Sequence, residues 1–106
     1  MTALEDLPTS APRGVFSITL DGEVDLLRQA ELHALVQAFR QSDDSSARIE
    51  LGGVSFMDST ALGVLSQIRN IALERGGDVT LVDPTPACLK ILRIVGFDTV
   101  FVLERS

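Results

Sequence analysis

The sequence predicts a single α/β domain with helices packed on a mixed, mostly parallel β-sheet. Short runs of apolar and β-branched residues alternate with longer segments of helical apolar spacing, which is the pattern of strand–helix–strand crossovers. The length of 106 residues and the 45% hydrophobic content suffice for one core and leave no room for a second domain. An Asp-Gly pair after the first apolar run adds an N-terminal antiparallel hairpin strand to the predicted sheet.

Residues 1–14 are expected to form a flexible N-terminal tail, with the folded domain spanning residues 15–106. The tail contains Glu5, Asp6 and two prolines, and it has neither the basic start nor the apolar centre of a signal peptide. No apolar run approaches the length of a membrane span. We therefore expect a soluble, cytoplasmic domain.

The first half of the folded part predicts one strand and one helix. Residues 15–20 alternate in part and are rich in strand formers, and residues 21–22 (Asp-Gly) then predict a tight turn, as a hairpin or a bend. Apolar residues recur at three- and four-residue spacing over residues 26–41, which predicts a helix with Asp25 as its N-cap. Residues 42–46 are polar and are expected to form a solvated loop, in which the paired aspartates need no metal.

The middle of the chain predicts two short strands and a second helix. The strands cover residues 47–51 and 54–57, and the helix runs over residues 59–75. Gly76-Gly77 supplies a left-handed C-cap for that helix.

The last part predicts a third core strand, a third helix and a final short strand. The core strand covers residues 79–82, and Thr85 then caps a helix that has Pro86 at its first position. Gly96 ends this helix, and residues 100–103 form the last strand.

Charge and cysteine content exclude several classes of partner. The net charge of −6 and the pI near 4.5 argue against a nucleic-acid surface, because the nine basic residues are scattered along the chain. An anionic membrane surface is disfavoured for the same reason. The single Cys88 excludes an intramolecular disulfide, and its expected role is that of a small buried residue on a helix.

The Asp58-Ser59-Thr60 triplet stands where an apolar strand pattern stops and a helical pattern begins. The first turn of a helix has N–H groups without intrahelical partners and a partial positive charge, so it tolerates an anion. A phosphoryl group on Ser59 would be accommodated there and would add roughly 1.5 to 2 negative charges to the surface. The alternative is that Asp58 or Ser59 is only an N-cap, since these residue types are preferred at that position in any protein.

Enzyme motifs are missing from the sequence. A serine hydrolase needs a base beside its nucleophile, but the single His33 belongs to a different predicted helix and no Gly-x-Ser-x-Gly elbow is present. Neither glycine-rich nucleotide-binding loop occurs, and there are too few ligands for zinc. A phospho-aspartate receiver could use Asp58, but its acidic pair and late lysine are not evident, since Lys90 lies within a predicted helix. We therefore expect no enzyme, no catalytic residue, no metal and no cofactor.

Several segments in the same order resemble one family. Residues 22–25 (Gly-Glu-Val-Asp) resemble its Gly-Glu-Leu/Ile-Asp signature, and residues 53–63 resemble its segment ending Asp-Ser-Ser-Gly-Leu-Gly. Similar residues also stand at 76–77, 84–87 and 96–97. On these motifs the chain resembles the STAS domains, named for sulfate transporters and anti-sigma factor antagonists, and in particular the small stand-alone antagonists, over residues 15–103.

The resemblance implies a phosphorylation switch. Ser59 is then the residue phosphorylated by a cognate anti-sigma factor that is itself a serine kinase, with Thr60 as a secondary acceptor and a PP2C-type phosphatase to reset it. The dephosphorylated protein binds that kinase and releases a sigma factor, which regulates transcription. The partner-binding residues carried over are Glu23, Asp25, Asp58, Ser59, Thr60 and Leu62. The resemblance also implies that Asp25 and the Asp58-Ser59-Thr60 triplet lie on neighbouring loops at one end of the sheet.

The sequence departs from the family at three positions, and one alternative function stays open. Thr60 stands where serine is usual, Ala61 where glycine is usual, and Glu50 where aspartate is common. These changes concern the choice of partner rather than the fold. The alternative is a non-phosphorylated STAS scaffold in a lipid-transport or stress-sensing complex.

Overall fold

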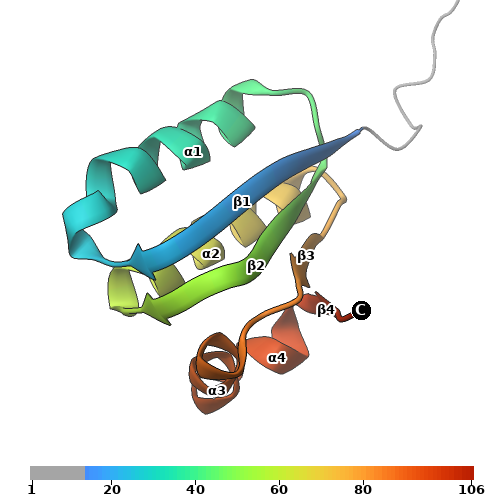
Figure 1. Cartoon of the computed structure of the whole chain (residues 1–106). Helices are drawn as coiled ribbons and strands as arrows, with labels where there is room; N and C mark the ends of the chain where they lie inside the picture. Colours follow the sequence, from blue (N-terminus) through green and yellow to red (C-terminus); the bar gives the residue numbers. More distant parts are fainter. Residues whose placement is uncertain (1–13) are drawn as a thin grey trace, which may run out of the picture.

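The computed structural model describes residues 14–106, in which four parallel strands form one sheet with helices packed against it (Figure 1). The sheet order follows the chain order of the strands, which are β1 (Val15–Val24), β2 (Ser46–Met57), β3 (Val79–Val82) and β4 (Val102–Glu104). The helices are the 3-10 turn η2 (Leu26–Arg28), α1 (Gln29–Gln41), α2 (Ser59–Glu74), α3 (Pro86–Ile94) and the short α4 (Phe97–Val100). The predicted α/β class is confirmed. The tail predicted for residues 1–14 lies, except for Gly14, outside the described residues.

The predicted antiparallel hairpin strand is wrong for the described residues, because every strand pairing within 14–106 is parallel. Instead of turning back at Asp21-Gly22, β1 continues to Val24. Its register against β2 shifts between Thr19 and Asp21 and again between Gly22 and Glu23, and Gly22 has a φ of +65°. The Asp-Gly pair therefore forms an irregularity inside the strand, and such bulges bend a strand without ending its pairing.

The two strands predicted at 47–51 and 54–57 are one continuous strand, β2, which passes through Gly52 and Gly53. It pairs with β1 on one side and with β3 on the other, so it is a central strand of the sheet. Its buried side chains are Ala47, Ile49, Leu51, Val54 and Met57. Because these side chains anchor β2 in the core, the strand fixes the position of the residues that follow its carboxyl end.

Local capping sets the helix ends as predicted. The hydroxyl of Thr85 accepts from the N–H of Cys88 (3.2 Å), and Pro86 occupies the first turn of α3. Beyond α2, Gly76 has a φ of +77° and the N–H of Gly77 donates back to the helix.

The last strand begins later than predicted. The sequence predicts a strand over residues 100–103, whereas Val100 ends α4 and β4 begins at Val102. The N–H of Phe101 donates to the carbonyl of Phe97 (3.0 Å), and the two rings pack with centroids 5.1 Å apart. This aromatic pair favours one helical turn where an extended chain was expected.

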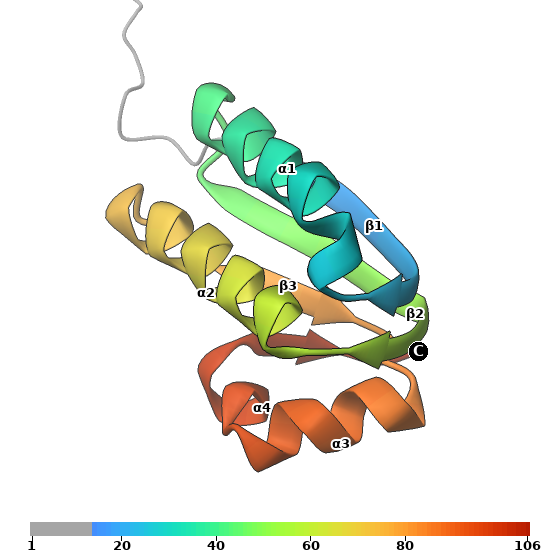
Figure 2. The same ribbon diagram turned by 90° about the vertical axis from the view of Figure 1, so that its left-hand side faces the viewer.

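One hydrophobic core unites the layers. Helices α1 and α2 lie side by side against the sheet, and α3 and α4 lie together at the end of the molecule away from α1 (Figures 1 and 2). The largest fully buried side chains are Phe39, Leu32, Ile49, Leu51, Met57, Leu65, Ile68, Leu81 and Leu92. Burying each of these contributes on the order of 1.5–3 kcal/mol. Cys88 is also buried, as predicted, and its burial raises the pKa of the thiol to about 11.

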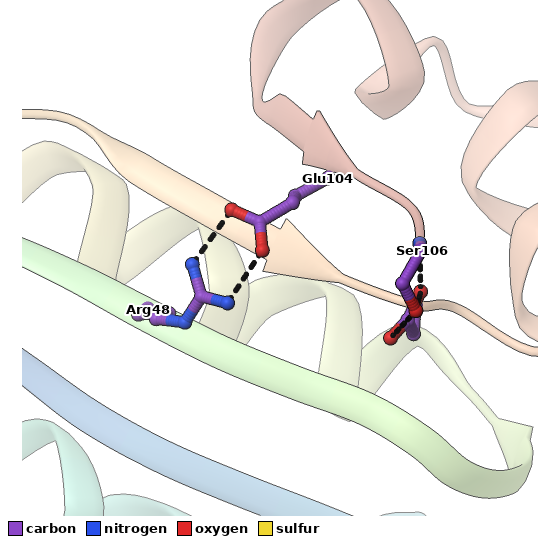
Figure 3. A network of polar contacts seen from close by, with 4 residues as sticks. Arg48, Glu104 and Ser106 are labelled. Atoms are coloured by element: carbon purple, nitrogen blue, oxygen red, sulfur yellow. Dashed lines mark hydrogen bonds and ion pairs between the residues drawn. The ribbon is translucent and has the colours of Figure 1, made fainter.

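A pair of polar contacts fixes the short edge strand β4. Figure 3 shows Arg48 of β2 reaching across β3 to Glu104, with two hydrogen bonds of 2.7 and 2.5 Å. The carboxylate of Asp83, just after β3, accepts from the N–H of Ser106 (2.7 Å). Together these contacts tie the C-terminal residues to two other strands.

Candidate functional site

The predicted site residues come together because β1 and β2 run parallel and end at the same edge of the sheet. Val24 of β1 is the register partner of Met57 of β2. Asp25 directly follows β1, and Asp58 directly follows β2. Each therefore lies between the end of a strand and the start of a helix. This confirms that the two acidic segments lie on neighbouring connections at one end of the sheet.

Asp58 holds the starts of two helices with one side chain. Its Oδ1 atom accepts from the N–H groups of Thr60 (2.9 Å) and Ala61 (3.2 Å), which makes it the N-cap of α2. Its Oδ2 atom accepts from the N–H of Leu26 (3.1 Å), at the beginning of η2. The N–H of Asp58 in turn donates to the carbonyl of Val24 (3.3 Å). The carboxylate therefore fixes the geometry of both connections.

Asp25 is an N-cap, as predicted, but it caps the 3-10 turn η2, and the helix predicted over residues 26–41 is divided into η2 and α1, which begins at Gln29. Its Oδ1 atom accepts from the N–H of Leu27 (3.1 Å), and its carbonyl accepts from the N–H of Arg28 (2.9 Å). The guanidinium of Arg28 folds back to donate to the carbonyl of Glu23 (3.0 Å) and to the carboxylate of Glu31 (2.8 Å). These hydrogen bonds lower the pKa of Glu31. Arg28 is thus occupied by groups of its own chain, and the surface around it is left acidic.

Ser59 is the first residue of α2 and is exposed, while Thr60 is partly buried. Both line a shallow, mostly polar groove of about 370 Å³. The side of the groove away from α2 is formed by Gln29 and His33 of α1. The sequence set His33 apart because it lies on another helix, but the packing of α1 against α2 brings it to the same groove as Ser59. Only this tertiary contact could have revealed it.

Glu23 and Leu62 lie at the margins of the site. Glu23 is exposed near the end of β1, where its register partner is Phe56 of β2. Leu62 is half-buried and packs against the core, so only part of its side chain is available to a partner.

Three exposed apolar side chains at this edge were not predicted as site residues. Leu26 is 59% exposed, Leu27 is 93% exposed, and Phe56 is 47% exposed. In the sequence, all three lie outside the apolar stripe of the adjoining helix or strand, and this pattern could have identified them as exposed. They place apolar surface beside the acidic residues and Ser59, which is the composition of a protein-binding surface.

The family comparison agrees with this arrangement. A family profile described as "Mlab, STAS domain" matches residues 9–104. The chain belongs to the STAS family. This STAS domain resembles the unphosphorylated form of the anti-sigma factor antagonist SpoIIAA, with a TM-score of 0.74 and 19% identity over 86% of this chain and 80% of that one. A candidate anti-sigma factor antagonist from Thermotoga maritima is similar as well, with a TM-score of 0.75 and 20% identity over 84% of this chain and 80% of the other. At these identities the two likenesses concern the fold. No curated protein matches the sequence.

Within residues 14–106, no group of three or more His, Cys, Asp or Glu side chains is placed to hold a metal ion. In the same part of the chain, no helix combines the length and apolar character needed to span a bilayer.

Proposed function

We propose that this STAS domain is an anti-sigma factor antagonist controlled by phosphorylation of Ser59. In the dephosphorylated form it binds an anti-sigma factor that is a serine kinase, and it thereby releases a sigma factor for transcription. The kinase phosphorylates Ser59 and ends the binding, and a PP2C-type phosphatase restores it. The protein acts in the cytoplasm by binding and not by catalysis. The observation that supports this proposal most is the exposed Ser59 at the first position of α2, directly after the Asp58 cap.

A phosphate on Ser59 is compatible with the fold for a physical reason. The helix N-terminus favours a negative charge by about 0.3–1 kcal/mol, so the modified domain stays folded. The switch acts at the surface, where the new charge stands close to the carboxylates of Asp25 and Asp58 in a fitted interface. An uncompensated cost of roughly 3 kcal/mol in that interface would weaken binding about a hundredfold.

The exposed apolar residues supply the attractive part of the same interface. Leu27, 93% exposed at the tip of η2, has little reason to face water in the free protein. We assign Leu26, Leu27 and Phe56 to the contact with the anti-sigma factor, with Glu23 and Asp25 pairing with basic groups of that partner. Thr60 takes part through its side chain at the groove and is the secondary acceptor.

The test uses the full-length protein with its anti-sigma kinase and ATP. Phosphorylation is mapped by fragment mass spectrometry, and binding is measured by titration calorimetry. We expect phosphate on Ser59, binding by Ser59→Ala as tight as by the wild type, and about a hundredfold weaker binding by Ser59→Asp. Leu27→Gln should weaken binding at least about tenfold without changing the free energy of unfolding.

Matched controls separate these effects from general changes in charge or polarity. Asn70→Asp adds the same charge at an exposed position later in α2, and Leu73→Gln removes an apolar side chain that is 48% exposed on the same helix. Both should bind like the wild type. Tight binding by Ser59→Asp, or weak binding by Asn70→Asp, would contradict the proposed switch.

A second candidate function is a constitutive STAS scaffold, because the matching family profile names Mlab rather than an antagonist. In that case the Asp58-Ser59-Thr60 triplet is only a helix cap, and the protein is a subunit of a lipid-transport or stress-sensing complex. Mass spectrometry of the protein recovered from its own cells distinguishes the two. Partial phosphorylation of Ser59 that varies with growth condition supports the antagonist, and its absence under every condition, including stress, supports the scaffold.

A further inference from the structure

A second groove lies along the outer side of α3 and shares no residue with the groove at Ser59. Its volume is about 520 Å³, and its apolar lining comes from Pro84, Pro86, Leu89 and Ile94. Leu89 is buried, whereas Ile94 is 73% exposed and stands at the margin. The two prolines restrict the backbone on one side, so the groove has a stiff wall and an open apolar side.

The remaining lining residues are all basic: Lys90 and Arg93 on α3, and Arg105 directly after β4. Within residues 14–106, the ion pairs are made by Arg28 and Arg48, so these three cations have no carboxylate partner there. The carboxylate of Asp83, just before Pro84, accepts hydrogen bonds from Ser106. Those hydrogen bonds lower the pKa of Asp83, and the charges of Arg48 and Arg105 add to the effect.

The spacing of these residues makes the groove a continuous stripe on one helix face. Pro86, Leu89 and Arg93 follow one another at intervals of three and four, and Pro86, Lys90 and Ile94 follow at intervals of four. Residues at these intervals are neighbours on a helix surface. Apolar and basic side chains therefore alternate along the same strip of α3.

The sign of the charge identifies the kind of occupant. The whole chain carries a net charge of −6, yet this groove presents three cations and, among the described residues, no acidic lining residue. A nucleic acid or an anionic bilayer would meet repulsion from the rest of the molecule. A short segment that enters only the groove would meet the local positive charge and the apolar strip alone.

We propose that the groove on α3 binds an acidic amphipathic segment of a partner protein, with apolar side chains against Leu89 and Ile94 and carboxylates against Lys90, Arg93 and Arg105. This surface is separate from the Ser59 site, so the domain can hold two partners at once. The proposal does not depend on the phosphorylation switch.

The first experiment titrates isotope-labelled, full-length protein with a synthetic helical peptide that has leucines on one face and glutamates on the other. A matched peptide replaces the glutamates with lysines. We expect the acidic peptide to shift the amide signals of residues 86–94 and of Arg105, and to bind at least about tenfold more tightly than the basic one. Arg93→Glu and Ile94→Gln should each weaken the binding of the acidic peptide about tenfold.

Control variants and competing occupants decide the interpretation. Arg40→Glu on α1 and Leu73→Gln on α2 change charge or polarity at other exposed positions and should bind like the wild type. Equal binding of the two peptides, signal shifts elsewhere, or an unchanged affinity in Arg93→Glu would overturn the proposal. Binding to phosphatidylglycerol vesicles in place of the peptide, or a dimer that shifts the same α3 signals, would overturn it in favour of a membrane or a second copy.

A crosslinking experiment applies the same test in cells. A photoreactive amino acid at position 94 of the full chain captures whatever lies in the groove, and mass spectrometry identifies the captured segment. An acidic segment with apolar residues at helical spacing supports the proposal. A basic or uncharged segment, or no captured protein, contradicts it.

Discussion

The carboxylate of Asp58 connects two chain segments that are more than thirty positions apart in the sequence. It accepts from two N–H groups at the start of α2 and from one at the start of η2. The hydroxyl of Ser59 is therefore held on a connection whose shape is fixed from both sides. The two interpretations of the triplet, a cap and a switch, are compatible, since Asp58 forms the cap and Ser59 stays exposed.

Replacing Asp58 should cost more than the loss of an ordinary N-cap. Asp58→Ala leaves three N–H groups without this acceptor, so we expect the free energy of unfolding to fall by about 2–3 kcal/mol, compared with about 1 kcal/mol for a typical cap. Asp58→Asn keeps one acceptor oxygen and should lose less. Urea denaturation measures the difference, with Asp43→Ala in the exposed loop before β2 as the control. Equal losses in Asp58→Ala and Asp43→Ala would show that the double cap is not stabilising.

At the scale of elements, the junction after α2 shows how tightly the connections fit. Gly76 has a φ of +77° and open space around it, whereas a Cβ on Gly77 would overlap the carbonyl oxygen of Ser45. The first glycine is needed for its backbone conformation, and the second for the close approach of the loop before β2. The sequence marks both with the same letter, but the physical reasons differ.

Alanine at the two positions should therefore have unequal effects. Gly76→Ala forces an alanine into the left-handed region, which costs about 1–2 kcal/mol. Gly77→Ala requires the backbone near Ser45 to move and should cost about 3 kcal/mol, at the upper end of overpacking effects. The measurement is urea denaturation of both variants, and Gly63→Ala is the control, because a Cβ there meets nothing within 4 Å. A larger loss at Gly76 than at Gly77 would refute this assignment.

For the whole molecule, polar contacts tie the edge strand β4 to the rest of the sheet. It has only three residues, and Glu104 is hydrogen-bonded to Arg48 two strands away. Hydrogen bonding to Arg48 lowers the pKa of Glu104. Because the folded-state pKa lies below that of the unfolded chain, this contact stabilises the fold above the unfolded value of about 4.3. The stabilisation is lost as the pH falls through the folded-state pKa.

Acid should therefore weaken the wild type more than a variant without this carboxylate. In Glu104→Gln we expect lower stability at neutral pH and a flatter decline in the free energy of unfolding between about pH 5 and pH 3. Urea denaturation over that range tests the difference, with Glu74→Gln at the exposed end of α2 as the control for the removed charge. Asp83, whose pKa is lowered by Ser106, keeps part of the slope in both proteins. Parallel pH profiles for the wild type and Glu104→Gln would contradict the role of the Arg48 contact.

The sequence by itself determined the features that depend on short-range chemistry. Asp25, Asp58 and Thr85 cap helices because a side-chain oxygen reaches N–H groups two or three residues ahead, and Gly76 and Gly96 end helices because they adopt a positive φ. These effects act within one helical turn and can be recognised in any fold. The meeting of Asp25 and Asp58 was expected from the family resemblance, and the parallel pairing of β1 and β2 provides its geometry.

Only the tertiary structure decided the features that depend on register and packing. The Asp-Gly pair became a bulge because β2 pairs with both sides of it, and Phe101 closed an extra helical turn onto Phe97. His33 joined the groove at Ser59 because α1 packs against α2, and α3 gathered its apolar and basic strip at one groove. The pairing of β1 with β2 and the packing of α1 against α2 unite residues that lie far apart in the sequence. The sheet register and the burial of the helix stripes fix the distance between them in space, and both are properties of the whole core.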